Sequence, residues 1–153
     1  MGTWLSVQES ARQMVREGHG GSIVVVSSTN AFQPQRTGTF YNTAKSGQVA
    51  VMHTAAMELA PLGIRVNGLA PGIIDTRLSR LAIDNPLLSK VYLDRTPMGR
   101  FADPVEMARP ILFMCSDDAS FMCGELMVVD GGYSVGLPGG RELLTKLEAE
   151  AAR

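Results

Sequence analysis

The chain has 153 residues, of which 45% are hydrophobic, with a formal net charge of −1 and a mean hydropathy of +0.07. This size and composition predict one soluble domain with a sizeable core. The near-neutral charge gives no electrostatic reason to expect nucleic acid or a membrane surface as a partner, and no apolar run approaches the ~18 residues of a membrane span.

Two cysteines, Cys115 and Cys123, match neither a paired metal-ligand spacing nor a disulfide framework. We therefore expect reduced thiols in or near the core of a cytoplasmic protein, and we predict no metal site. Residues 1–18 contain four charged side chains and no long apolar middle, so a signal peptide is not expected.

The first predicted element is an amphipathic helix over residues 3–17, followed by a glycine-rich turn. Apolar residues recur along it at helical spacing, namely Trp4, Val7, Ala11 and Met14. Residues 22–28 (SIVVVSS) then form a run rich in β-branched residues. Such a run is typical of a parallel strand that is buried on both faces.

The second predicted helix covers residues 40–60 and carries a tyrosine and a lysine on one face. Tyr41 and Lys45 are four residues apart, so the ammonium can reach the ring hydroxyl. A nearby cation favours the ionised phenol, which suits Tyr41 to give or accept a proton. Ser28, at the end of the preceding strand, would hold a substrate oxygen beside it.

A second strand is predicted over residues 64–69 and a third over 126–129. The carboxyl ends of parallel strands meet at one edge of a sheet, which is where ligands bind in open α/β folds. We therefore expect Ser28, the Pro71 and Gly72 turn, and residues 130–132 to build one site together.

Residues 77–98 are rich in leucine and are predicted to form one or two short helices. They would be either a lid over a hydrophobic or medium-sized substrate or a surface packed on a neighbouring subunit. In the next helix Asp103 is the expected N-cap, Pro104 the first residue and Glu106 the partner in a capping box. A short polar helix is predicted for residues 141–153, and four residues are interpreted as core side chains: Met114, Phe121, Met122 and Met127.

Together these segments resemble the C-terminal half of the short-chain dehydrogenase/reductase family, which includes 3-oxoacyl-carrier-protein reductases and glucose dehydrogenase-like members. The family's active site is a serine followed about a dozen residues later by Tyr-x-x-x-Lys, and Ser28, Tyr41 and Lys45 keep that spacing. Further family signatures follow in order at 64–76 (IRVNGLAPGIIDT), 99–104 (GRFADP) and 129–132 (VDGG).

The resemblance implies an α/β fold, namely the C-terminal half of a Rossmann-like doubly wound parallel sheet with about three parallel strands and flanking helices. The N-terminal half that binds the dinucleotide phosphates would be absent. The single domain would comprise a helix (1–18), a catalytic core (22–76), a substrate lid (77–100), the last helix and strand (101–132) and a tail (133–153).

The resemblance also implies an NAD(P)-dependent oxidoreductase that transfers a hydride between a nicotinamide and a carbonyl or alcohol substrate. Tyr41 would be the acid/base, Lys45 would assist it, and Ser28 would orient the substrate. The implied cofactor-binding residues are Tyr41, Lys45, Pro71, Gly72, Ile74 and Thr76. The choice between NAD and NADP is not readable from this sequence.

A first strand, a glycine-rich turn and a helix facing the pyrophosphate are not found in the sequence. We therefore expect the chain by itself to bind NAD(H) or NADP(H) weakly. The alternative is a catalytically inactive remnant that acts only as an oligomerising module. In the family, the helices that match 3–17 and 40–60 form subunit interfaces, so a homodimer or homotetramer is predicted.

Overall fold

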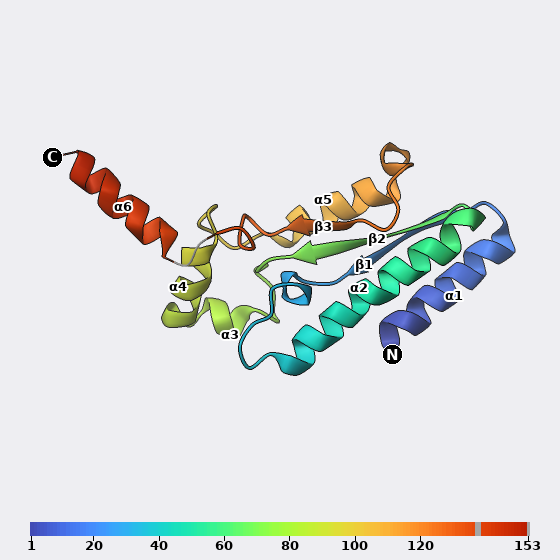
Figure 1. Ribbon diagram of the computed structural model, residues 1–153, viewed down its shortest axis with the longest axis horizontal. Helices are drawn as coiled ribbons and strands as arrows, with labels where there is room; N and C mark the ends of the chain where they lie inside the picture. The colour runs from blue at the N-terminus through green and yellow to red at the C-terminus, as the bar shows by residue number, and fades with distance from the viewer. Residues whose placement is uncertain (137–138, 153) are drawn as a thin grey trace.

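The computed structural model describes residues 1–136 and 139–152, which fold around a three-stranded parallel sheet in the order β1-β2-β3 (Figure 1). The strands are β1 (Gly21–Val26), β2 (Ile64–Pro71) and β3 (Leu126–Val129). Gly21 pairs with Ile64, and Gly68 pairs with Leu126, so the short β3 lies beside the second half of β2. The predicted α/β class with about three parallel strands is confirmed.

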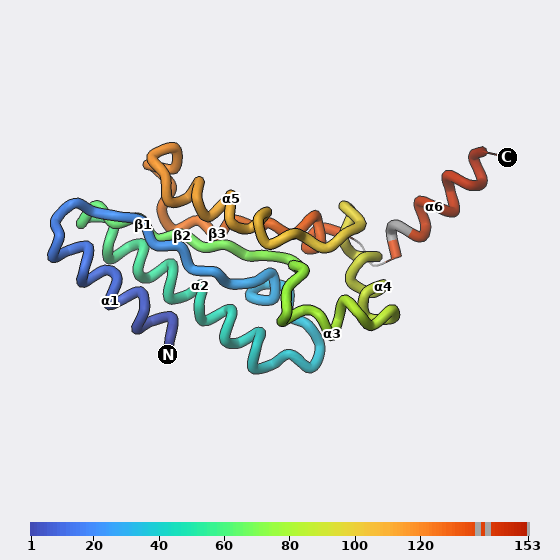
Figure 2. The backbone as a smooth tube through the Cα atoms, turned by 180° about the vertical axis from the view of Figure 1, so that it is seen from behind, coloured from blue at the N-terminus to red at the C-terminus, as the bar shows by residue number. Residues whose placement is uncertain are grey.

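Helices cover both faces of the sheet. α1 (Gly2–Glu17) and α2 (Thr39–Leu59) lie on one face, and α5 (Pro104–Cys115) lies on the other (Figures 1 and 2). Because successive side chains along a strand point to opposite faces, β2 contributes side chains to a hydrophobic core on each face of the sheet. Ile64 and Val66 pack with α2, whereas Leu69 packs with α5.

The glycine group at residues 18–21 is the turn between α1 and β1. Gly18 ends α1 in the left-handed conformation, with φ of 74°. A Cβ at Gly20 would lie 2.5 Å from the carbonyl oxygen of Gly63, so the turns that precede β1 and β2 abut at the amino ends of the strands. This close approach explains why glycine is needed there.

The start of α5 confirms the predicted capping box. The Asp103 carboxylate accepts from the amide of Val105, and the Glu106 carboxylate accepts from the amide of Asp103. These two bonds satisfy amide groups that the first turn of a helix leaves without a partner. Pro110 lies within the same continuous helix, which runs to Cys115.

Three of the predicted burial assignments are wrong. Phe121 is fully exposed, although Met114 is buried and both Met122 and Met127 pack against the α5 core as expected. Phe121 lies in the turn between α5 and β3, which projects beyond the sheet (Figure 1). Cys115 and Cys123 are also exposed. Cys115 follows Met114 on α5, and one residue further along a helix points about 100° away from the buried face.

The segment 77–100, called the lid below after its predicted role, and the tail from 133 onward have few buried residues, namely Thr96 and Tyr133 among those that the structure describes. The lid forms two short helices, α3 (Arg80–Ile83) and α4 (Pro86–Arg95), as predicted, and α6 (Gly140–Ala151) contacts α4 and extends away from the sheet (Figure 1). Across residues 1–136 and 139–152, no helix combines the length and the apolar character needed to cross a membrane.

Candidate active site

The carboxyl ends of the strands meet as predicted. The amide of Ser27 donates to Leu69 O at 2.8 Å, and the amide of Gly72 donates to Val129 O at 3.1 Å. A Cβ at Gly72 would lie 2.8 Å from the Cβ of Asp130, so glycine lets the turn after β2 approach the turn after β3. Three segments that are distant in the sequence therefore share one edge of the sheet.

Two neighbouring serines leave β1 with different roles in the structure. Ser27 is buried, and its hydroxyl donates to Lys45 O at 2.9 Å, which ties the end of β1 to α2. Ser28 caps the short 3₁₀ turn Thr29–Ala31, and its hydroxyl oxygen accepts from the amide of Asn30 at 3.2 Å. The sequence identified Ser28 but missed the structural role of Ser27.

Tyr41 and Lys45 stand one helical turn apart on α2. The spacing predicts that the two side chains share one face of the helix, and the Lys45 Nζ does lie over the aromatic face of Tyr41, 5.6 Å from the ring centre. The same Nζ donates to Val26 O at 3.3 Å. Partial burial lowers the pKa of Lys45 below its usual value of 10.5. Tyr41 as a whole residue is 44% exposed, so solvent and small molecules can reach it.

A pocket of about 520 Å³ opens at this edge of the sheet. Its walls come from the end of β1, the start of α2, the turn after β2 and the lid helices. All the residues that the sequence predicted to be catalytic or cofactor-binding line this one pocket, namely Ser28, Tyr41, Lys45, Pro71, Gly72, Ile74 and Thr76.

The pocket also contains side chains that were not predicted as catalytic or cofactor-binding residues. Ser79 fixes the loop that carries Ile74 and Thr76, because its hydroxyl donates to Ile74 O and accepts from the amide of Thr76 at 3.0 Å. Its position three residues after Thr76 is a usable signal for such a local turn. Tyr92 reaches the pocket from α4. No local pattern predicts that Tyr92 lines the pocket, because its position depends on where α4 lies relative to the sheet.

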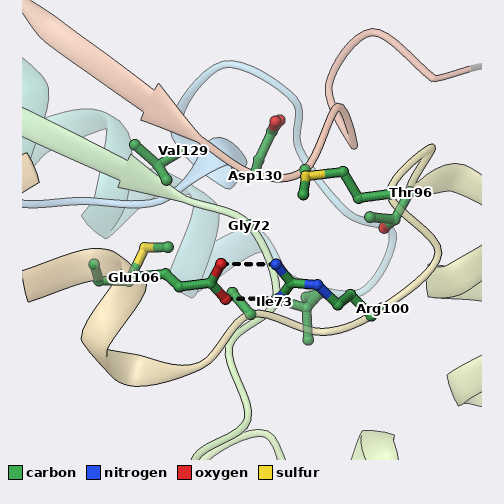
Figure 3. Close-up of a pocket in the computed structure, with 11 residues that line it drawn as sticks. Gly72, Ile73, Thr96, Arg100, Glu106, Val129 and Asp130 are labelled. Carbon is green, nitrogen blue, oxygen red and sulfur yellow. Dashed lines mark hydrogen bonds and ion pairs between the residues drawn. The ribbon is translucent and has the colours of Figure 1, made fainter. Parts of the chain in front are cut away.

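A small cavity of about 70 Å³ shares Gly72 and Ile73 with this pocket. Asp130 and Gly131 line this cavity and not the large pocket, so the prediction that residues 130–132 share one site with Ser28 is wrong. Figure 3 shows the Arg100 guanidinium facing the Glu106 carboxylate, with both bonds at 2.7 Å. The pKa of Glu106 is lowered from 4.5 to about 2. The largest cause is the hydrogen-bonded Arg100 side chain, and the second is the hydrogen bond from the amide of Asp103. The segment 99–106 therefore supports the start of α5 beside the pocket.

The donors in the large pocket fit the nicotinamide and ribose end of a dinucleotide. Lys45 gives one of its three ammonium donors to Val26 O, and the others can reach a hydroxyl in the pocket. Within the described residues, the glycine group at 18–21 lies at the opposite end of the strands and is not a phosphate loop. Among the described residues, the pocket therefore matches the nicotinamide and ribose end of the cofactor and not its pyrophosphate.

Comparison with known proteins gives a consistent result. A family model described as enoyl-(acyl carrier protein) reductase matches residues 1–134. The L-rhamnose 1-dehydrogenase (NAD(P)(+)) of a Sphingomonas species is 40% identical over 136 residues, which cover 89% of this chain and 54% of that protein. The 3-oxoacyl-(acyl-carrier-protein) reductase of Aquifex aeolicus is 37% identical, with 86% and 52% covered. The chain thus spans about half the length of these relatives.

Solved structures agree with the sequence relatives. A short-chain type dehydrogenase/reductase from Mycobacterium ulcerans superposes with a TM-score of 0.85 at 37% identity, covering 88% of this chain and 49% of that one. An NADP-bound structure from Agrobacterium tumefaciens gives a TM-score of 0.81 at 30% identity, covering 84% and 52%. The family model, which matches residues 1–134, spans the sheet, the helices on both of its faces and the residues that line the pocket.

Proposed function

The chain belongs to the short-chain dehydrogenase/reductase family, and from this premise we propose that it supplies the proton-transfer part of an NAD(P)-dependent oxidoreductase acting on an alcohol or carbonyl compound. The observation that carries the proposal is the convergence of Ser28, Tyr41 and Lys45 on one pocket. Relatives named as dehydrogenases and reductases support the same reaction class.

Each residue has a definite task in the proposed reaction. A bound nicotinamide would supply or accept the hydride at the substrate carbon. Tyr41 gives the proton to the substrate oxygen in reduction and accepts it in oxidation. The Lys45 ammonium, 5.6 Å from the ring centre, stabilises the negative charge that the phenol oxygen carries after proton loss. The Ser28 hydroxyl donates to the substrate oxygen and stabilises its developing charge.

The proposed cofactor contacts lie on the turn after β2 and on α2. Pro71, Gly72 and Ile74 would meet the nicotinamide, and Thr76 and Lys45 would bond to polar groups beside it. Because the described residues supply no pyrophosphate cradle, we expect the dissociation constant of the isolated chain for NAD⁺ or NADP⁺ to exceed ~100 μM. Isothermal titration calorimetry measures it, and micromolar affinity would contradict this expectation.

The catalytic assignment is tested with a pair of variants on α2. The purified chain is assayed at saturating NAD⁺ or NADP⁺, with L-rhamnose and cyclopentanol as probe alcohols. Tyr41→Phe should lose turnover, because the ring stays while the exchangeable proton is removed. The matched control is Thr43→Ala, an exposed residue of the same helix outside the pocket. Equal turnover in the two variants would refute the role of Tyr41.

We also propose that the chain self-associates through α1 and α2. A surface hollow of about 440 Å³ lies between these helices, and Trp4 and Val15, which line it, are 38% and 50% exposed. Apolar groups at such a hollow favour association. Light scattering should give a mass above that of one chain, and Val15→Glu should lower it. A monomeric wild-type chain would overturn this proposal, whereas association in an inactive chain would favour the oligomerising module.

A further inference from the structure

Tyr92 has no role in the proton-transfer chemistry, yet it lines the same pocket as Tyr41. It comes from the lid helix α4, whereas Ser28 and Tyr41 come from the sheet side. A second tyrosine therefore faces the space where a substrate would lie.

The position of Tyr92 is set by a stack of side chains from two separate segments. Its ring lies against the ring of Tyr133, with centroids 6.4 Å apart and planes tilted by 44°. The guanidinium of Arg95, also on α4, lies 4.6 Å from the centre of the Tyr133 ring. Tyr133 is only 3% exposed and forms the centre of the stack. Aromatic and cation–π contacts of this kind favour one relative placement of the groups.

The turn that carries Tyr133 is itself firmly held. The Asp130 carboxylate accepts from the amides of Gly132 at 2.9 Å and Ser134 at 2.7 Å. A Cβ at Gly136 would lie 2.1 Å from Arg95 O, so the turn fits closely against the end of α4.

A hydrogen bond joins this turn to the other side of the pocket. The Gln33 side chain, from the loop after Ser28, donates to Ser134 O at 3.2 Å. The segment 130–136 therefore contacts both the loop that follows β1 and the lid helix that faces it. It is well placed to fix the width of the pocket between them.

The chemistry of the pocket wall indicates what Tyr92 would contact. Among the described residues that line the pocket, Lys45 is the one charged side chain, and the lid contributes Leu78, Ala82 and Tyr92. Arg80, which lies between two of these lid residues, is paired with Asp75. Such a wall suits an uncharged molecule with a ring or alkyl face.

We propose that Tyr92 is a substrate-binding residue for neutral alcohols or carbonyl compounds with a ring or alkyl face, and that Tyr133 is the positioning residue that holds it. The substrate contact rests on the proposed function. The positioning of α4 by Tyr133 does not, so the two parts can be tested separately.

The positioning role is tested by backbone hydrogen exchange on the full chain without any ligand. Tyr133→Leu should speed exchange across Pro86–Arg95 about tenfold, because α4 loses its anchor, while exchange in Ile64–Pro71 stays unchanged. Tyr133→Phe keeps the ring and should match the wild type. Should Tyr133→Leu fail to fold, Arg95→Gln removes the cation alone and should give a smaller increase in the same helix. Unchanged exchange in α4 for both disruptive variants would overturn the positioning role.

The substrate role is tested by separating KM from kcat. Tyr92→Leu should raise KM for cyclopentanol about tenfold, with kcat and the KM for the nicotinamide cofactor changed less than about threefold. Equal losses for both ligands would overturn the assignment. If wild type shows no turnover, saturation-transfer NMR with cyclopentanol replaces the assay. Binding that Tyr92→Leu abolishes supports the inference even where the proposed reaction fails, and binding that survives the substitution refutes it.

Discussion

The two sides of the pocket are built in different ways. On the sheet side, Tyr41 and Lys45 stand on a helix whose Met52, Ala55 and Ala56 are buried against β2. On the lid side, α3 and α4 contain no buried residue, and Leu81 is 88% exposed. The residues proposed for proton transfer therefore stand on a helix that the core fixes, whereas the side proposed to contact the substrate depends on a few specific contacts. Regions with few buried contacts open at lower free-energy cost.

The sharpest way to test this comparison is to remove one polar group from each side. Lys45→Met keeps the length of the side chain but removes the cation beside the phenol, so kcat should fall by ~10²–10⁴-fold. Tyr92→Leu on the lid should act mainly on KM for the alcohol. Steady-state kinetics with cyclopentanol distinguishes the two effects. A lid variant that lowers kcat as much as Lys45→Met would erase the distinction.

The same truncation should cost much more free energy of unfolding on the sheet side than on the lid side. Leu69 lies on β2 and is fully buried against α5, so Leu69→Ala should lower the free energy of unfolding by ~2–5 kcal/mol. Leu81→Ala makes the same change on the exposed lid and should stay within about 0.5 kcal/mol of the wild type. Urea unfolding followed by circular dichroism measures both. A Leu81→Ala effect as large as that of Leu69→Ala would mean that the lid is part of the core.

Two glycines on the sheet side differ in how closely they are packed, so adding a methyl group should affect stability in opposite directions. Gly72→Ala would bring a Cβ to 2.8 Å from that of Asp130, and overpacking of this kind should cost ~1–3 kcal/mol. Gly47 has open space around it in the middle of α2, so Gly47→Ala should stabilise the chain by ~0.5–1 kcal/mol. Thermal unfolding of both variants should therefore shift in opposite directions. A stabilising Gly72→Ala would contradict the close approach of the two turns.

The smallest expected effect concerns the ion pair beside the pocket. Arg100 holds the pKa of Glu106 at about 2, below its usual 4.5, so its contribution to stability is complete above pH 4.5 and is lost as the pH falls towards 2. Thermal midpoints of wild type and Glu106→Gln should differ at pH 5 and converge near pH 2. A difference that does not change with pH would mean that Glu106 acts only through packing.

Much of the sheet side could be predicted because its signals are local. The four-residue spacing of Tyr41 and Lys45 gives their proximity on a helix, and the sequence around Asp103 and Glu106 gives a capping box. The strands follow from short apolar runs. The predicted catalytic and cofactor roles of the pocket residues stay predictions that the variants above test.

The errors and omissions share a different origin. Phe121 and the two cysteines were assigned to the core by residue type, but their exposure depends on which way each segment turns relative to the sheet. Tyr92 and Tyr133 are far apart in the sequence, and no residue pattern near either one predicts their contact. A contact of this kind has no local signature.

The sequence by itself determined the order and type of the main elements, the family, and the pair of side chains suited to proton transfer, because helix spacing and strand patterns arise from backbone geometry within a few residues. Only the tertiary structure decided that the ends of β1 and β2 line one pocket with α3 and α4 while the turn after β3 lines the cavity beside it, and that the Tyr133 ring packs against Tyr92. Those arrangements depend on packing between segments separated by tens of residues, where burial and close approach select one placement among many.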